Sequence, residues 1–93
     1  MILKFKEFYP NIHTSAWIAP SADLIGNIQI GEDSSVWFQC VIRADVNKVV
    51  IGKNTNIQDL SMIHTDHNTQ TIIGDNVTIG NNVMLHRCKI KNN

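Results

Sequence analysis

The 93-residue sequence predicts an all-β protein, a left-handed parallel β-helix of hexapeptide repeats with about four coils. Three observations support this prediction. An aliphatic residue recurs every six positions, a small or apolar residue follows it four positions later, and glycine often comes directly after it. A period of six matches neither the 3.6-residue stripe of an amphipathic helix nor a heptad. The alternative is an ordinary β-sandwich in which this spacing is a coincidence.

Composition excludes several other classes of protein. The chain is 43% hydrophobic, which is too apolar for a disordered tail, and its eight basic and eight acidic residues exclude a basic nucleic-acid-binding arm. No apolar run approaches the roughly 18 residues of a membrane span, and the charged start lacks the apolar stretch of a secretory signal. Cys40 and Cys88 have no CxxC spacing, so we expect reduced thiols in a cytoplasmic protein.

The elements follow from the repeat in chain order. Residues 1–17 precede it, and we expect them to cap the first coil with an edge strand and a turn at Pro10. Residues 18–93 form the repeat domain, in which three hexapeptides close one triangular coil and successive coils stack about 4.8 Å apart. The residues expected to point inward are Ile18, Leu24, Ile30, Val36, Ile42, Ile51, Ile57, Ile63, Ile73, Ile79 and Leu85. Their expected partners are Ala22, Ile28, Ser34, Cys40, Val46, Thr55, Ser61, Val77 and Val83.

Two slips in the aliphatic series, of three and four residues, predict loops near residues 47–50 and 65–71. We expect glycine or asparagine at the turns either to take a positive φ or to allow the close approach of two backbones. The repeat stops in mid-coil at residues 90–93, so we expect an incomplete β-helix that is the first half of something longer.

Two histidines occupy the same place in their hexapeptides. His64 and His86 each follow an inward-pointing aliphatic residue and lie one 18-residue coil plus the four-residue slip apart. We therefore expect them to stack in successive coils, about 4.8 Å apart at the backbone, with Arg43 one coil earlier. Two imidazoles at that separation could converge on one metal ion, and surface side chains are the alternative. A third ligand would come from a neighbouring corner or subunit, and flat prism faces favour a cyclic trimer with sites between subunits.

Other polar and aromatic residues have two interpretations each. Asp66 and His67 lie in the predicted loop, where they are either solvated or substitute ligands, and His13 is expected on the surface of the cap. A charged set lies near the same edge and comprises Arg43, Asp45 and Asp59. It is either a surface network that contributes little to stability or a set buried in a subunit interface, and we favour the interface. We expect corner or interface packing, rather than a substrate platform, for Trp17, Trp37 and Phe38.

Residues 18–64, which contain NIQD with a histidine five residues later, resemble the γ-class carbonic anhydrase family of the hexapeptide-transferase superfamily. Residues 72–88, IIGDNVTIGNNVMLHRC, resemble the second histidine block of the same family. The similarity covers nearly all of residues 10–93. It implies a homotrimer of left-handed β-helices with one divalent metal at each subunit interface, usually zinc, with iron or cobalt as alternatives.

The resemblance also implies a ligand set. His64 and His86 match the first and last ligands of the family, whereas Asn81 replaces the middle histidine, which the family takes from the adjacent subunit. An amide oxygen is a weaker ligand than an imidazole, so we expect reduced zinc affinity. Gln58 matches a glutamine that hydrogen-bonds the metal-bound water, and Asn56 matches a polar residue that orients the substrate.

Further family residues and departures follow from the same resemblance. The charged set matches residues that link subunits and shape the pocket. His67 is the candidate proton relay, because Val46 stands where the best-studied members have an acidic shuttle. Family glycines are replaced by Ala44, Leu60 and Arg87.

The implied activity is the hydration of carbon dioxide to bicarbonate by a zinc-bound hydroxide, which the change at Asn81 is expected to impair. Two alternatives stay open. One is a non-catalytic remnant or assembly subunit, which Asn81, Arg87 and the uncapped end favour. The other is an acyltransferase of the same superfamily, with its substrate between coils of adjacent subunits.

Overall fold

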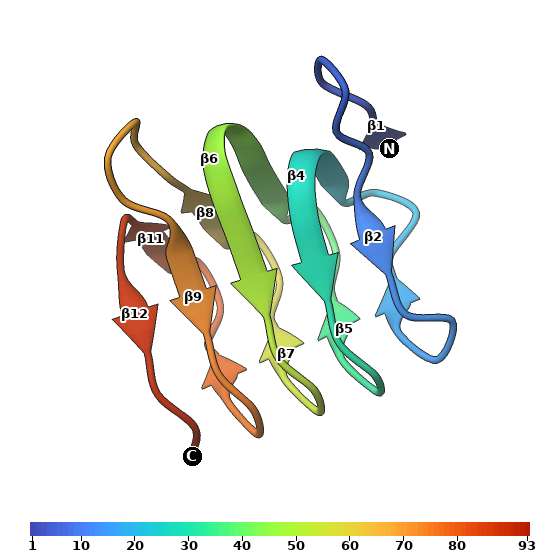
Figure 1. The fold of residues 1–93 in the computed structure, drawn as a ribbon. Helices are drawn as coiled ribbons and strands as arrows, with labels where there is room; N and C mark the ends of the chain where they lie inside the picture. The colour runs from blue at the N-terminus through green and yellow to red at the C-terminus, as the bar shows by residue number, and fades with distance from the viewer.

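A computed structural model describes residues 1–93, and it contains twelve β-strands and no α-helix (Figure 1). No helix long and apolar enough to cross a membrane is present. The strands are β1 (Ile2–Leu3), β2 (Asn11–Ile12), β3 (Trp17–Ile18), β4 (Asp23–Ile30), β5 (Ser35–Val36), β6 (Val41–Ile51), β7 (Asn56–Ile57), β8 (Met62–His64), β9 (Thr71–Ile73), β10 (Thr78–Ile79), β11 (Met84–His86) and β12 (Lys89–Ile90).

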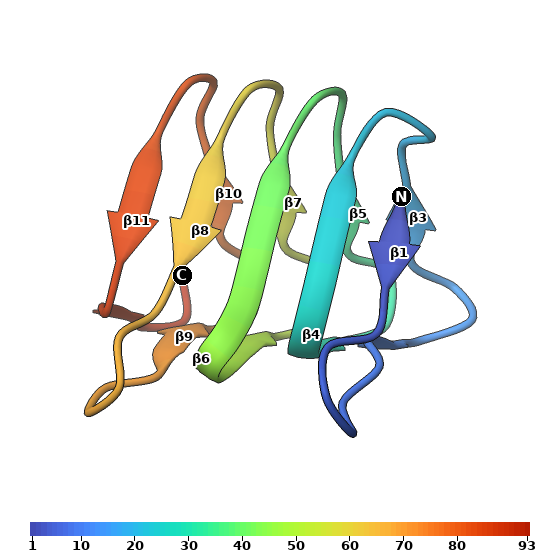
Figure 2. The ribbon, with the colours of Figure 1, turned by 90° about the horizontal axis from the view of Figure 1, so that it is seen from above.

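The strands form three faces of a coil, and all pairings between them are parallel. One face follows the order β1-β4-β6-β8-β11, and a second joins β2, the ends of β4 and β6, β9 and β12. The third is the four-stranded sheet β10-β7-β5-β3. In Figure 1 the chain descends on the near face, rises on the far side and advances from right to left, which makes the coil left-handed. The predicted fold class is therefore confirmed, and Figure 2 shows the successive coils side by side.

The six-residue aliphatic series forms the core. Nine of its eleven members are buried, and the first and last, Ile18 and Leu85, are half-buried against the core. Burying one such side chain contributes about 1.5–3 kcal/mol. The repeat therefore encodes one continuous apolar column that runs through all the coils.

The small-partner series is correct except at one position. Val46 is 37% exposed, and Val49 takes the buried place instead, in register with Ile28. The prediction of a loop at residues 47–50 is also wrong. Strand β6 runs unbroken through this segment, and its three extra residues bulge out before Val49. The second predicted loop is confirmed at residues 65–70, between β8 and β9.

The repeat glycines and the residues with positive φ have different structural roles. Positive φ values at two corners belong to Asp33, Asn54, Asn76, Gln39, Leu60 and Asn82, and not to the repeat glycines. Gly31, Gly52 and Gly74 instead permit close stacking, since a Cβ on Gly52 would lie 2.7 Å from the Gly74 carbonyl. Of the two uses expected for glycine, close backbone approach is the one found at these three positions.

Buried hydroxyl groups join consecutive coils at the same corners. Ser34 donates to the Gly52 carbonyl at 2.6 Å and accepts from the Thr55 backbone N–H at 3.0 Å. Thr55 repeats both bonds one coil later, donating to Gly74 at 2.7 Å. Each hydroxyl therefore satisfies two polar groups of the next coil, which makes its burial favourable.

The N-terminal segment extends two faces beyond the first coil. Strands β1 and β2 pair with the two halves of β4, and Pro10 between them is buried. The last residue of the segment, Trp17, already pairs with the repeat through β3 and β5. The boundary between cap and repeats at residue 17 stays a prediction.

Candidate metal site

Two imidazole rings stack on the face formed by β8 and β11. The parallel register places His86 directly opposite His64. Their ring centroids lie 5.1 Å apart, and the ring planes differ by 12°. The predicted stacking is confirmed, because the four extra residues between the histidines leave at the corner and do not shift the strand register.

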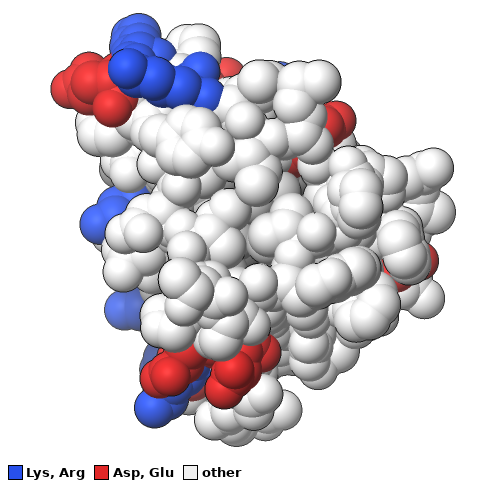
Figure 3. Space-filling model, turned by 90° about the vertical axis from the view of Figure 1, so that its right-hand side faces the viewer, with Lys and Arg blue, Asp and Glu red and all other residues white.

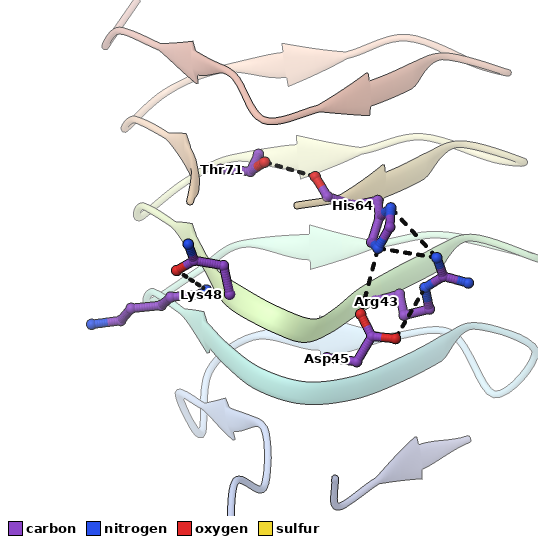
Figure 4. Close-up of polar contacts among 6 residues, drawn as sticks. Arg43, Asp45, Lys48, His64 and Thr71 are labelled. Carbon is purple, nitrogen blue, oxygen red and sulfur yellow. Dashed lines mark hydrogen bonds and ion pairs between the residues drawn. The ribbon is translucent and has the colours of Figure 1, made fainter. Parts of the chain in front are cut away.

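Arg43 and Asp45 contact the inner histidine from β6 (Figure 4). Arg43 is in register with His64, and its Nη2 lies 3.0 Å from His64 Nε2. Asp45 Oδ1 lies 3.4 Å from the same Nε2, while Asp45 Oδ2 lies 3.4 Å from Arg43 Nε. Two atoms of this cluster, Arg43 Nε and Asp45 Oδ1, are buried without a hydrogen-bond partner.

The backbone of His64 is anchored from two sides. The buried Thr71 donates its hydroxyl to the His64 carbonyl at 2.7 Å, as Figure 4 shows, and the Arg87 backbone N–H donates to the same oxygen at 3.2 Å. These bonds close the corner around the residue 65–70 loop. Both bonds fix the backbone of His64 at the start of the loop, and so they fix the place from which its ring projects.

Both insertions leave the coil at the same corner, next to the histidine column, and they form the extended upper edge in Figure 1. Asn47 in the first insertion donates to the His67 carbonyl in the second at 3.4 Å. Residues 44–48 also line a hollow of about 310 Å³ with Lys6, Phe8 and Asn27. The slips were visible in the sequence, but the alignment of the two insertions beside the histidines was missed.

The loop carries His67 on its exposed side and Asp66 against the last coil. Asp66 accepts from the backbone N–H groups of Asn68 and Thr69 at 3.0 and 2.8 Å and from Arg87 Nη1 at 3.3 Å. Desolvation raises the pKa of Asp66, but these donors outweigh it, and the pKa lies below its usual value. No hydrogen bond or ion pair joins the His67 ring to the histidine pair.

The remaining predicted site residues lie on or next to another face. Asn56 is the first residue of β7 and Gln58 directly follows the strand. Asn56 Oδ1 accepts from Ser35 Oγ at 2.5 Å, and the backbone carbonyl of Gln58 accepts from Cys40 Sγ at 2.9 Å. Asn81 is exposed in the following corner. No hydrogen bond joins these three residues to the histidine pair within one chain.

Only two of the three residues in the charged set lie next to each other. Arg43 and Asp45 are adjacent, whereas Asp59 has no ion-pair partner and contributes its backbone carbonyl to the Asn82 N–H at 2.9 Å. Its predicted role in a subunit interface stays a prediction.

Cys40 and Cys88 are both free thiols. Burial raises the pKa of each thiol, so both are held in the protonated form. The aromatic residues pack against one another, with centroids 4.8 Å apart for Trp17 and Trp37 and 6.0 Å for each with Phe38.

The pair of imidazoles fits a divalent metal as two of its ligands. Neutral ring nitrogens are common ligands for zinc, and stacking in adjacent coils brings both rings to one point on the surface. One chain does not bring three His, Cys, Asp or Glu side chains together as a complete metal-binding group. The donor set therefore fits a metal that takes its third protein ligand from outside this pair.

The fold and the histidine column together define a left-handed β-helix protein with two stacked histidines on one face. A comparison with protein-family models found no match. Curated relatives include a mitochondrial γ carbonic anhydrase of Arabidopsis thaliana, 47% identical over 88% of this chain and 32% of the relative. The uncharacterized transferase YtoA of Bacillus subtilis is 47% identical over 100% of this chain and 54% of its own length. The carbonic anhydrase of Geobacillus kaustophilus is 44% identical over 100% of this chain and 51% of its own length.

A solved structure shows the same fold. The hexapeptide transferase family protein of Anaplasma phagocytophilum superposes with a TM-score of 0.90 and 39% identity over 95% of this chain and 51% of that protein. The chain belongs to the γ-class carbonic anhydrase-like family of hexapeptide-repeat proteins. It spans about half the length of the bacterial relatives that it matches.

Proposed function

We propose that the chain is a γ-carbonic anhydrase-like metalloprotein that binds a divalent metal, usually zinc, and hydrates carbon dioxide to bicarbonate at an interface of a homotrimer. The stacking of His64 and His86, 5.1 Å apart in one column, is the observation that carries this proposal. Relatives named carbonic anhydrase support it. A cytoplasmic location stays a prediction, and the Arabidopsis relative is named mitochondrial.

Each site residue has a role in this proposal. His64 and His86 would each supply one ring nitrogen to the metal, and Asn81 of the partner subunit would supply its amide oxygen. When bound, the metal would supply the chemistry of a water that ionises near neutral pH. Gln58 orients that water, and Asn56, whose carbonyl oxygen Ser35 already holds, offers its amide N–H to the substrate. His67, exposed in its loop, carries the released proton to solvent.

The ligand assignment is tested by metal content and by the rate of carbon dioxide hydration. We expect His64→Ala and His86→Ala each to lose stoichiometric zinc, because a single remaining imidazole and an amide bind zinc weakly. His13→Ala is the matched control, since His13 is exposed and its ring bonds only to Ser15, with Oγ at 2.8 Å. Full zinc content in either variant at residue 64 or 86 would overturn the assignment.

A second candidate function is that of a non-catalytic subunit that only assembles, and the amide at Asn81 favours it. We expect Asn81→His to raise zinc affinity about tenfold or more and to increase hydration, because an imidazole replaces a weak neutral ligand. Titration calorimetry and the hydration assay measure both effects. If zinc affinity rises while hydration stays at the uncatalysed rate, the assembly function is favoured.

The name of the B. subtilis relative keeps an acyltransferase function open as a further alternative. Binding of an acyl-CoA to the purified chain would support that alternative. Its absence, together with bound zinc, would favour the metalloprotein.

A further inference from the structure

Two consecutive hydrogen bonds link the side chains of Trp37, Ser35 and Asn56 on the third face of the coil. Trp37 Nε1 donates to Ser35 Oγ at 2.8 Å, and Ser35 Oγ donates to Asn56 Oδ1 at 2.5 Å. All three side chains are half-buried. Ser35 in β5 is in register with Asn56 in β7, so the strand pairing brings the hydroxyl to the amide. Trp37 lies two residues after Ser35 and therefore on the same side of the strand.

The chemistry of the donors sets the direction of both bonds. An indole nitrogen can only donate, so Trp37 uses a lone pair of the Ser35 oxygen. The 2.5 Å between Ser35 Oγ and Asn56 Oδ1 is typical of an O–H···O bond, whereas N–H···O bonds measure about 2.7–3.2 Å. Ser35 therefore gives its only proton to the side-chain oxygen of Asn56. The Nδ2 group of Asn56 makes no hydrogen bond within the chain, which leaves its two protons for a ligand.

Aromatic packing holds the indole ring from which these bonds start. The ring centroid of Trp37 lies 4.8 Å from that of Trp17 and 6.0 Å from that of Phe38, with the Phe38 ring edge-on. Trp17 makes no hydrogen bond through its own Nε1. Charged side chains are sparse over the N-terminal end of the coil, to which Trp17 belongs (Figure 3). The hydrogen bond to Ser35 is therefore a property of Trp37 alone among the clustered rings.

We propose that Trp37 and Ser35 are positioning residues, which fix the amide of Asn56 with its N–H groups toward the substrate. An amide held in this way donates to the group it faces, and the oxygen atoms of carbon dioxide and bicarbonate are acceptors. Gln58, the proposed water-orienting residue, lies two residues after Asn56 on the same side of the strand. The inference rests on the proposed function for its substrate. The two hydrogen bonds themselves involve neither the metal nor its ligands.

The bonds are tested by NMR on the full, ¹⁵N-labelled 93-residue chain without metal. We expect the indole proton of Trp37 to exchange with solvent at least about tenfold more slowly than that of Trp17, because only the first is hydrogen-bonded. The Nδ2 signals of Asn56, identified by their loss in Asn56→Asp, should broaden or move in Ser35→Ala and in Trp37→Phe, because the amide can then turn. Equal exchange of the two indoles, or unchanged Asn56 signals in Ser35→Ala, would overturn the proposal.

Two variants are the matched controls. Trp17→Phe removes the same ring area as Trp37→Phe but no hydrogen bond, so the Asn56 signals should stay narrow. Ser35→Thr keeps the hydroxyl and should restore the signals that Ser35→Ala changes. If Trp37→Phe does not fold, Ser35→Ala and its rescue by Ser35→Thr decide the question. Equal broadening in Trp17→Phe and Trp37→Phe would show that ring packing, and not the hydrogen bond, holds the amide.

The effect on the reaction is tested by carbon dioxide hydration and by zinc content. We expect Ser35→Ala and Trp37→Phe each to lower kcat/KM about three- to tenfold, the value of one hydrogen bond, and to keep the zinc content unchanged. In the Asn56→Ala background, Ser35→Ala should cause little further loss, because the amide it positions is absent. The same loss in both backgrounds would overturn the positioning role and indicate a general structural effect.

The outcomes separate this inference from the proposed function. If the unaltered chain holds no zinc and hydrates no carbon dioxide, the proposed function falls, and the positioning of a substrate by Asn56 falls with it. If the unaltered chain is active and Ser35→Ala hydrates carbon dioxide at the same rate, the proposed function stands and the positioning role of Ser35 and Trp37 is overturned.

Discussion

Leu60 and Arg87 hold positive φ values of 64° and 44° at corners of the coil, although neither residue favours that conformation. Asn54, Asn76 and Asn82 occupy similar backbone positions with a side chain that tolerates them. The resemblance had already marked Leu60 and Arg87 as replacements of family glycines, and the backbone explains why glycine suits both places. The strain is local to each corner, and at Arg87 the strained corner directly follows His86.

We expect Leu60→Gly to stabilise the protein by up to about 1 kcal/mol. Relief of the left-handed conformation is worth roughly 1–2 kcal/mol, and the extra freedom of glycine in the unfolded chain offsets about 0.5–1 kcal/mol of it. Little packing is lost, because Leu60 is 56% exposed. Urea unfolding measures the difference. Lys53→Gly is the control at an exposed corner residue without positive φ, and equal destabilisation by both changes would contradict the prediction.

At the scale of the elements, the stack of glycines sets how closely neighbouring coils approach. A Cβ on Gly52 would lie 2.7 Å from the Gly74 carbonyl, whereas a Cβ on Gly80 would meet nothing within 4 Å. We expect Gly52→Ala to destabilise the fold by about 1–3 kcal/mol, since the backbone of the next coil must move. Gly80→Ala is the matched control and should stay within about 0.5 kcal/mol. Thermal unfolding compares them, and a similar loss in both variants would show that coil spacing is not limited by this contact.

The elements also show what the sequence could predict. The period of six was sufficient for the coil, the core and the stacking of His64 on His86, because strand register follows directly from spacing. It could not place the three extra residues of β6, since a slip between Ile42 and Ile51 fits several positions, and Val46 was assigned where Val49 lies. The contact of Arg43 with His64 depends on side-chain rotamers, which spacing does not determine.

At the scale of the whole molecule, the candidate site is divided between faces of the prism. His64 and His86 lie on the β8–β11 face, and Asn56 and Gln58 lie on or beside the β7 face, without a hydrogen bond between the two sets. A single chain therefore presents two incomplete halves. Packing of copies face to face would bring one half against the other, as the histidine column and the flat faces of the predicted prism already suggested from the sequence.

This division predicts that metal binding and self-association are linked. A metal that takes ligands from two copies binds the assembled form more tightly, so zinc should shift the equilibrium toward the trimer. Sedimentation equilibrium of the 93-residue chain should show a higher mass with zinc and a return to the lower mass with a chelator. His64→Ala should lose the zinc-dependent increase and keep any association driven by the apolar faces, while His13→Ala should behave like the unaltered chain. Zinc uptake by a chain that stays monomeric would mean that the third ligand does not come from another copy.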